Sequence, residues 1–204
     1  MKIVSPSAEF VTFTPDLERV IERAGRVCYK SEEKITNDSA AAFIKRIRQS
    51  RHESVIEHGS ITARFICDRG VSHELVRHRI ASFSQESTRY CNYAQDKFGS
   101  EITVIKPCFW PESSSAYRVW ARACLQAESA YFQLIEMGNP PQAARSVLPN
   151  SLKTEIVVTA NPREWMHIFR MRCASDAHPQ MREIMLPLQK ACVSNWPAIF
   201  GDLF

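Results

Sequence analysis

The stretch of sequence that decides the fold covers residues 61–70 and reads ITARFICDRG. Apolar side chains occupy every second position at its start: Ile61, Ala63, Phe65 and Cys67. This alternation predicts a β-strand with one buried face. The Asp68-Arg69-Gly70 turn is expected to close the strand, and a short helix is expected from Val71 to Arg79.

Patterns on either side of this strand predict further elements. Helices are indicated by apolar spacing, caps and breakers over residues 17–28, 38–48, 116–137, 162–173 and 181–193, with another short helix ending near Pro149. Strands are expected before residue 14 and over residues 102–105 and 155–160. The polar segment from Ile80 to Tyr93 is predicted to be a loop.

The size of the chain favours one domain of the α+β class over residues 1–204. With 45% hydrophobic and 24% charged residues, the composition excludes disordered and fibrous classes. The longest apolar runs are too short for a membrane span, and the N-terminus lacks the apolar core of a secretory signal. We therefore expect a cytoplasmic protein without membrane association.

Cysteine usage also suits a reducing compartment. The seven cysteines contain no C-x-x-C pair, which fits neither a disulfide framework nor a zinc ribbon, and we expect reduced thiols. Cys28, Cys67 and Cys124 lie in or beside apolar stripes and are predicted to be inert core residues. His52 and His58 do not have a dependable metal spacing, so we predict no metal.

The densest group of functional side chains covers residues 77–90, which read RHRIASFSQESTRY. Its arginines and hydroxyl groups can supply planar donors to phosphate oxygens. Two readings remain open from chemistry alone: an anion-binding site, or a solvated basic helix end whose cations complement the helix dipole.

The same residues resemble a known family. Arg77-His78-Arg79, seven further residues and Ser87 match the R-H-R-x7-S signature of flavin-dependent thymidylate synthases, and Arg89-Tyr90 continues it in register. The resemblance extends through residues 52–58, 145–149 and 161–163 to Arg172. It thus covers most of the chain.

The resemblance implies a fold, an activity and partners. It implies a mainly antiparallel sheet with packed helices in an obligate homo-oligomer, a homotetramer whose active sites are shared between subunits. The implied reaction is reductive methylation of dUMP to dTMP with FAD as cofactor, NADPH as reductant and methylenetetrahydrofolate as one-carbon donor. No cysteine nucleophile is expected, and nucleic acid is not an expected partner.

The resemblance also implies two sets of site residues. The dUMP set is Glu74, Arg77, Gln85, Glu86, Ser87, Thr88, Arg89, Arg145 and Arg172. The FAD set is His52, Ser54, Glu57, Arg77, His78, Arg79, Asn161, Arg163 and His167. Arg172 is similar to the arginine that activates the uracil ring. The chain departs from the family pattern at Cys28, where a flavin-contacting serine is common, and at His167, which replaces a frequent asparagine.

Two arginines are informative without the resemblance. Arg163 lies in the first turn of its helix, where the dipole disfavours a cation, so an anionic partner such as a flavin phosphate would explain it better than solvent. Arg172 falls on the apolar stripe of residues 165–169 and needs a partner where its guanidinium emerges. An unpaired surface Arg163 and a snorkelling Arg172 are the alternatives.

Two alternative functions fit the sequence less well. The basic loop with Phe83 and Tyr90 could bind single-stranded nucleic acid, but the formal net charge is only +4 and that function requires a wider basic face. A thymidylate synthase with a cysteine nucleophile requires Pro-Cys-His, whereas Pro107-Cys108 is followed here by Phe109.

Overall fold

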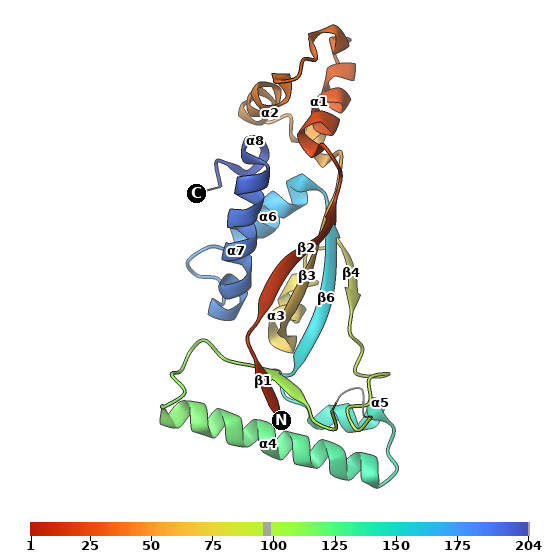
Figure 1. The fold of residues 1–204 in the computed structure, drawn as a ribbon, viewed down its shortest axis with the longest axis vertical. Coiled ribbons are helices and arrows are strands. Elements are labelled where there is room, and N and C mark those ends of the chain that lie inside the picture. The colour runs from red at the N-terminus through yellow and green to blue at the C-terminus, as the bar shows by residue number, and fades with distance from the viewer. Residues whose placement is uncertain (96–98, 204) are drawn as a thin grey trace. The chain divides into compact units, whose positions relative to one another are not determined.

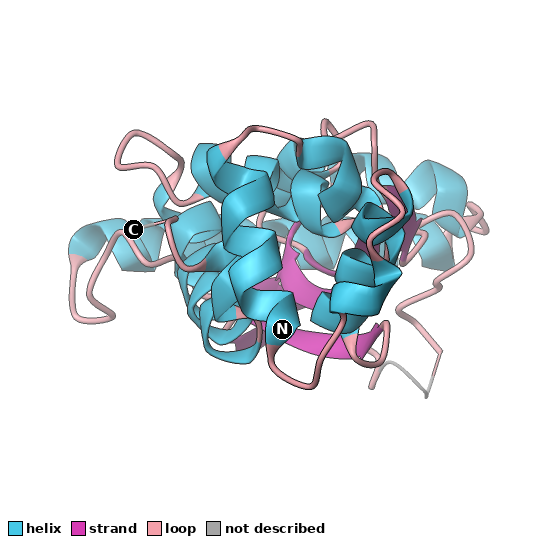
Figure 2. Ribbon diagram, turned by 90° about the horizontal axis from the view of Figure 1, so that it is seen from above, coloured by secondary structure: helices cyan, strands magenta, loops and turns pink. Residues whose placement is uncertain are grey.

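The computed structural model describes residues 1–95 and 99–203. It combines helices with strands, as Figure 2 shows by colour. The strands are β1 (Lys2–Val4), β2 (Ser7–Phe13), β3 (Ile61–Asp68), β4 (Ser82–Gln85), β5 (Thr103–Ile105) and β6 (Lys153–Ala160). The α-helices are α1 (Leu17–Val27), α2 (Ser39–Gln49), α3 (Arg69–Leu75), α4 (Ser115–Glu136), α5 (Pro141–Ala144), α6 (Pro162–Arg172), α7 (Pro179–Asn195) and α8 (Pro197–Phe200). Short 3-10 helices are η1 (Glu32–Lys34), η2 (Glu53–Glu57) and η4 (Arg145–Val147).

The main sheet has four strands in the order β2-β3-β6-β4 (Figure 1). Thr62, early in β3, shares a side-chain hydrogen bond of 2.9 Å with Thr159, late in β6. Arg69 N, directly after β3, donates to Leu152 O, directly before β6, at 3.1 Å. The two strands are therefore antiparallel, and the predicted α+β fold with a mainly antiparallel sheet is confirmed. The exception is a second, two-stranded sheet in which β1 pairs with β5 in parallel.

The chain divides into two compact units, each built from three segments. Unit 1 comprises Met1–Ser7, Phe65–Arg77 and Ser84–Ile156, and unit 2 comprises Ala8–Arg64, His78–Phe83 and Val157–Phe204. Four of the cuts fall within the strands β2, β3, β4 and β6, so these strands contribute residues to both units, and the fifth falls between α3 and β4. The expectation of one domain over residues 1–204 stays a prediction.

The core of unit 1 forms between the long helix α4 and the strand β5. It contains the buried residues Tyr93, Ile102, Val104, Cys124, Tyr131, Ala144 and Leu152. Ser114 begins α4 as a cap, because its hydroxyl accepts from Tyr117 N at 3.1 Å. Gly138, at φ 83°, follows the helix in a left-handed conformation that glycine adopts without steric cost.

The core of unit 2 is helical. Helix α1 packs on α2 and η2, α6 packs on η2 and α7, and α8 contacts both α2 and α7. The ring of Trp165 stacks on Phe169 with centroids 5.6 Å apart, and Phe169 meets Phe200 edge-on at 6.0 Å. The indole N–H of Trp165 donates to Ile61 O at 2.9 Å, which ties α6 to β3 within this unit.

Most predicted elements are confirmed to within a few residues, and two expectations are wrong. Residues 80–93 are not all loop, because Ser82–Gln85 forms β4 and pairs in the main sheet. Helix α3 begins at Arg69 rather than after a turn and ends at Leu75, before the Arg77-His78-Arg79 motif. The cause of the early start is Asp68, whose carboxylate caps the helix by accepting from Val71 N at 2.7 Å.

The cap at Asp68 yields a prediction about stability. Replacing Asp68 with Ala should lower the free energy of unfolding by about 0.5–2 kcal/mol, because a buried N–H at the start of α3 loses its acceptor. Urea denaturation followed by circular dichroism measures this difference. Asp68→Asn keeps an acceptor oxygen and is the matched control, with a smaller loss expected. Equal losses in the two variants would contradict the capping role.

Candidate active site

Eight of the nine predicted nucleotide residues lie in unit 1, and the ninth, Arg172, lies in unit 2. Gln85 is half-buried, and its amide nitrogen donates to Ser72 Oγ at 2.9 Å and to Thr154 Oγ1 at 3.2 Å. Glu74, in α3, is also half-buried, whereas Arg77 lies beyond the helix and is exposed. Glu74, Arg77 and Gln85 therefore all belong to unit 1.

Glu86 is held by two donors. Its carboxylate accepts from Tyr93 Oη and from Lys153 Nζ, each at 3.2 Å. Lys153 also donates to Glu155 at 2.6 Å. Burial lowers the pKa of Lys153, but the two carboxylates outweigh it and the net shift is upward. Lys153 therefore stays a cation and keeps Glu86 in a fixed position, a contact that sequence reasoning missed.

The loop that follows Glu86 contacts Arg145, an arginine from outside the signature. Thr88 is buried and its hydroxyl accepts from Arg145 NH1 at 3.2 Å. Ser87 Oγ accepts from the backbone N–H of Arg89 at 3.3 Å. The Arg89 guanidinium is exposed and lies 5.4 Å from the ring centre of Tyr90. Arg145 thus contacts the residue that precedes Arg89 in the chain, and a shared phosphate for the two arginines stays a prediction.

The predicted flavin residues lie in unit 2, apart from Arg77. Several of them line an open cleft of about 530 Å³, within the usual size range of small-molecule sites. Its lining residues are Gly25, Cys28, Tyr29, Ile47, Arg51, His52, Glu53, Ser54, Val55 and Arg163. Arg51, His52 and Arg163 give the cleft three nitrogen-bearing side chains that can donate to an anion.

Arg163, a cation in the first turn of α6, is paired with two carboxylates. Its NH1 lies 2.6 Å from Glu57 Oε1, and its Nε lies 3.3 Å from Glu53 Oε2, both on η2. The alternative of an unpaired surface arginine is therefore wrong. The expectation of a flavin phosphate as its partner stays a prediction, and the ion pair links Glu57 to a residue that lines the cleft.

Arg172 and His78 meet at the end of α6. The helix begins with Asn161, whose side chain accepts from Glu164 N at 2.8 Å, and Arg172 is its last residue. Arg172 Nε donates to His78 Nε2 at 3.0 Å. His78 is only 4% exposed, while Arg79 beside it is exposed. The partner that Arg172 requires is thus a histidine of the signature itself.

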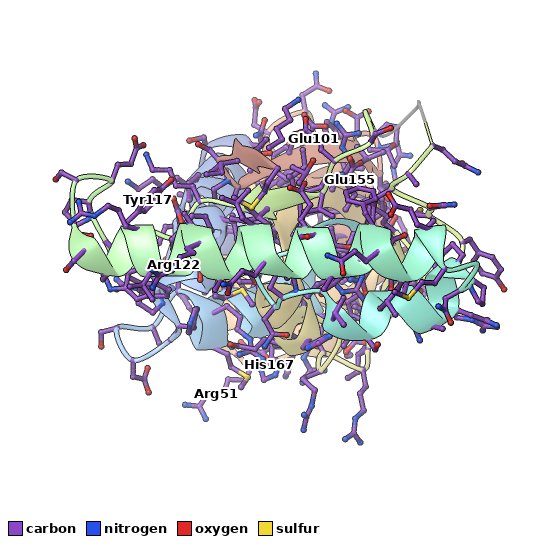
Figure 3. All side chains as sticks on the ribbon, turned by 90° about the horizontal axis from the view of Figure 1, so that it is seen from below. Arg51, Glu101, Tyr117, Arg122, Glu155 and His167 are labelled. Carbon is purple, nitrogen blue, oxygen red and sulfur yellow. The ribbon has the colours of Figure 1, made fainter. Side chains whose placement is uncertain are left out.

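Two further side chains of α6 face the same imidazole. His78 Nδ1 lies 3.6 Å from Glu164 Oε1, and Glu164 is buried. The ring of His167, exposed and labelled in Figure 3, meets the ring of His78 edge-on at 5.6 Å. Burial lowers the pKa of His78, and the charges of Arg172 and His167 lower it further, to about 4. The imidazole is therefore neutral at physiological pH.

The sequence analysis did not assign Glu164 to the site. The available signal was its spacing from His167, because residues three apart lie on one side of a helix. Ligand atoms of His78, Glu164 and His167 all lie within 4.8 Å of one another, a spacing that a divalent cation could use. The guanidinium of Arg172 beside His78 disfavours a cation there. The absence of a metal remains a prediction.

The cysteines differ in accessibility. Cys67 and Cys124 are buried as predicted, and burial raises the pKa of Cys67 to about 12. The expectation that Cys28 is a core residue is wrong: it is exposed and lines the cleft, because it lies just past the last residue of α1. Cys108 is also exposed.

The sequence matches a family described as thymidylate synthase complementing protein over residues 9–198. A flavin-dependent thymidylate synthase of Geobacter sulfurreducens is 37% identical, covering 93% of this chain and 83% of the relative. The enzyme of the same description from Corynebacterium glutamicum is 31% identical over 95% of this chain and 82% of its own length.

The fold agrees with these matches. A solved structure described as a UMP/dUMP methylase PolB from Streptomyces cacaoi superposes with a TM-score of 0.81 at 24% identity, covering 98% of this chain and 96% of the other. The chain therefore has the α+β fold of the thymidylate synthase complementing proteins. The chain belongs to the flavin-dependent thymidylate synthase family, a family of methyl-transferring enzymes. Within the described residues no helix has both the length and the apolar character needed to cross a membrane.

The lowered pKa of His78 predicts a pH dependence of stability. Between about pH 6.5 and pH 4 the unfolded chain binds a proton that the folded imidazole does not, so the free energy of unfolding should fall as the pH falls through this window. Urea denaturation at a series of pH values measures this, with His78→Gln as the reference. The fall should be shallower in that variant. Parallel pH profiles for the two proteins would contradict a lowered pKa.

Proposed function

We propose that this protein methylates dUMP to dTMP, using FAD as cofactor, NADPH as reductant and methylenetetrahydrofolate as one-carbon donor. The observation that carries the proposal is the family membership, together with an arginine at the end of α6 that is anchored on the family's signature histidine. PolB, described as a UMP/dUMP methylase bound with 5-Br dUMP, supports a pyrimidine nucleotide as substrate.

The residues of unit 1 fit a nucleotide monophosphate. Arg89 and Arg145, which contacts the neighbouring Thr88, would bind the phosphate, with Ser87 and Thr88 as additional hydroxyl donors. Gln85 and Glu86 are already fixed by hydrogen bonds, so their remaining donor and acceptor groups could orient the base with little loss of side-chain entropy. Glu74 and Arg77 complete this proposed set.

The cleft in unit 2 fits the flavin cofactor. It offers Arg51, His52 and Arg163 to an anionic group and Ser54 as a hydroxyl donor. His78, Arg79, Asn161 and His167 complete the set that would hold it. A reduced flavin supplies the hydride that completes the methyl group. The protein residues bind and orient the cofactor and the substrate, and they exclude water from the site.

Methylation at carbon 5 of uracil requires the ring to become nucleophilic. Covalent attack at carbon 6 or stabilisation of negative charge on the ring can achieve this. We assign the second route to Arg172, whose permanent positive charge is held by His78. We assign no nucleophilic role to Ser87 or the cysteines. Burial raises the pKa of the Cys67 thiol to about 12, and Ser87 Oγ accepts from the backbone N–H of Arg89.

We further propose a homotetramer with active sites shared between subunits, acting in the cytoplasm. The exposed apolar residues Val119 and Leu125 on α4 support an interface between copies. No disulfide joins the cysteines of the described residues, which supports a reducing compartment.

The direct test is reconstitution and turnover. Purified protein incubated with FAD should elute from gel filtration at tetramer mass with flavin absorbance in the protein peak. With dUMP, NADPH and methylenetetrahydrofolate it should form dTMP, measured by chromatography. Omission of each component is the control. Flavin that elutes entirely free under saturating conditions, or no dTMP from flavin-loaded protein, would overturn the proposal.

The two arginine roles can be separated by kinetics. Arg89→Ala should mainly weaken dUMP binding, because a phosphate contact persists from ground state to transition state. Arg172→Ala should mainly lower kcat, by about 100- to 1000-fold, because it removes a donor to developing charge. Arg170→Ala removes an exposed arginine from the same helix turn and is the matched control. Equal losses of dUMP affinity with unchanged kcat in both test variants would refute this division.

A further inference from the structure

We propose that Glu164 is a positioning residue that fixes the tautomer of His78, and that this tautomer in turn fixes the guanidinium of Arg172. The three residues form a chain of contacts within unit 2. The consequence for catalysis rests on the function proposed above, whereas the tautomer does not.

The first step is a matter of hydrogen-bond chemistry. A guanidinium nitrogen can donate but cannot accept. Because Arg172 Nε lies 3.0 Å from His78 Nε2, that ring nitrogen must be the acceptor and carry no hydrogen. A neutral imidazole holds one hydrogen, which is therefore on Nδ1. Burial and the neighbouring cation keep the ring neutral, with a pKa of about 4.

The second step concerns what faces Nδ1. Glu164 Oε1 lies 3.6 Å from this nitrogen. This distance is too long for a good hydrogen bond, so the carboxylate acts through its charge. His78 and Glu164 are 4% and 7% exposed, and charge interactions are stronger in such poorly solvated surroundings. A carboxylate there stabilises the N–H dipole at Nδ1 and disfavours a lone pair at that position.

The third step connects the tautomer to Arg172. If the hydrogen moved to Nε2, two N–H groups would oppose each other and the contact with Arg172 would be lost. A guanidinium is planar, so anchoring Nε also fixes the plane of its two terminal nitrogens. A group that must meet developing charge on a substrate gains from such fixation, because a displacement of about 1 Å can cost about 100-fold in rate.

A purely structural role for Glu164 must be separated from this one. Glu164 is the third residue of α6, where an acid stabilises the helix dipole and can form a capping box with the cap residue. Either effect would alter stability without altering His78. Glu18 offers a matched control, because it is an acid in the first turn of α1 in the same unit.

The first experiment measures the tautomer without flavin or substrate. Protein labelled with ¹⁵N in its histidine rings is examined by solid-state NMR, and the His78 signals are assigned by their loss in His78→Gln. We expect the hydrogen on Nδ1 in the wild type and in Glu164→Gln, whose amide oxygen still faces Nδ1. Glu164→Ala should show a substantial Nε2–H population. Nε2–H in the wild type, or unchanged Nδ1–H in a folded Glu164→Ala, would overturn the proposal.

The second experiment measures turnover in the same variants. Glu164→Ala should lower kcat by about 10- to 100-fold with the KM for dUMP little changed, and Glu164→Gln should restore most of the loss. Glu18→Gln should leave the tautomer and kcat unchanged even if it lowers stability. A kcat loss in Glu164→Gln as large as in Glu164→Ala would contradict positioning through Nδ1.

The two experiments distinguish failure of this inference from failure of the proposed function. If the wild type makes no dTMP but shows the Nδ1–H tautomer and its dependence on Glu164, the contact chain stands and the function fails. If dTMP forms and the tautomer is independent of Glu164, the function stands and the positioning role fails.

Discussion

The antiparallel pairing of β3 with β6 is the constraint on which the rest of the structure depends. Both strands pass through the two compact units, and each leads directly into a helix that carries site residues. Asp68 ends β3 and caps α3, while Asn161 follows β6 and caps α6. A slip of one residue in this register would turn every side chain of one strand to the opposite face. The shared hydrogen bond of Thr62 with Thr159 is compatible with one register only.

Local sequence patterns were sufficient for the elements whose cause is local. Three examples are the apolar stripe of α1, the alternation in β3, and the cap and proline of α6. Each of these signals lies within the element that it predicts or directly beside it, and the three elements appear where they were expected. Strand β4 could not be predicted in this way, since its polar residues form a strand only because β6 supplies a partner. The parallel pairing of β1 with β5 joins residues about a hundred positions apart and has no local signature.

In the candidate site, too, the identity of the residues could be predicted from the sequence, whereas contacts between distant residues could not. The resemblance assigned most of its residues, but not what each one contacts. Arg172 and His78 are 94 residues apart in sequence, and Lys153 and Glu86 are 67 apart. The ion pair of Arg163 with Glu57 is another example, and exposed pairs of this kind contribute only about 0–1 kcal/mol. An incoming phosphate could therefore displace these carboxylates from Arg163, or share its guanidinium with them, at small cost, so the ion pair is compatible with ligand binding.

The route of β3 and β6 through both units also bears on how the chain folds. Neither unit is a continuous segment, so neither can be complete until residues from all three of its segments have been synthesised. Thr62 and its partner Thr159 are 97 residues apart, which corresponds to roughly 5 to 20 s of translation at ordinary rates. During that interval the apolar strand β3 has β2 on one side and an open edge on the other. Such an open edge can pair with another chain, and folding should be slower than that of a helical protein of equal length because the contacts that close the sheet are distant in sequence.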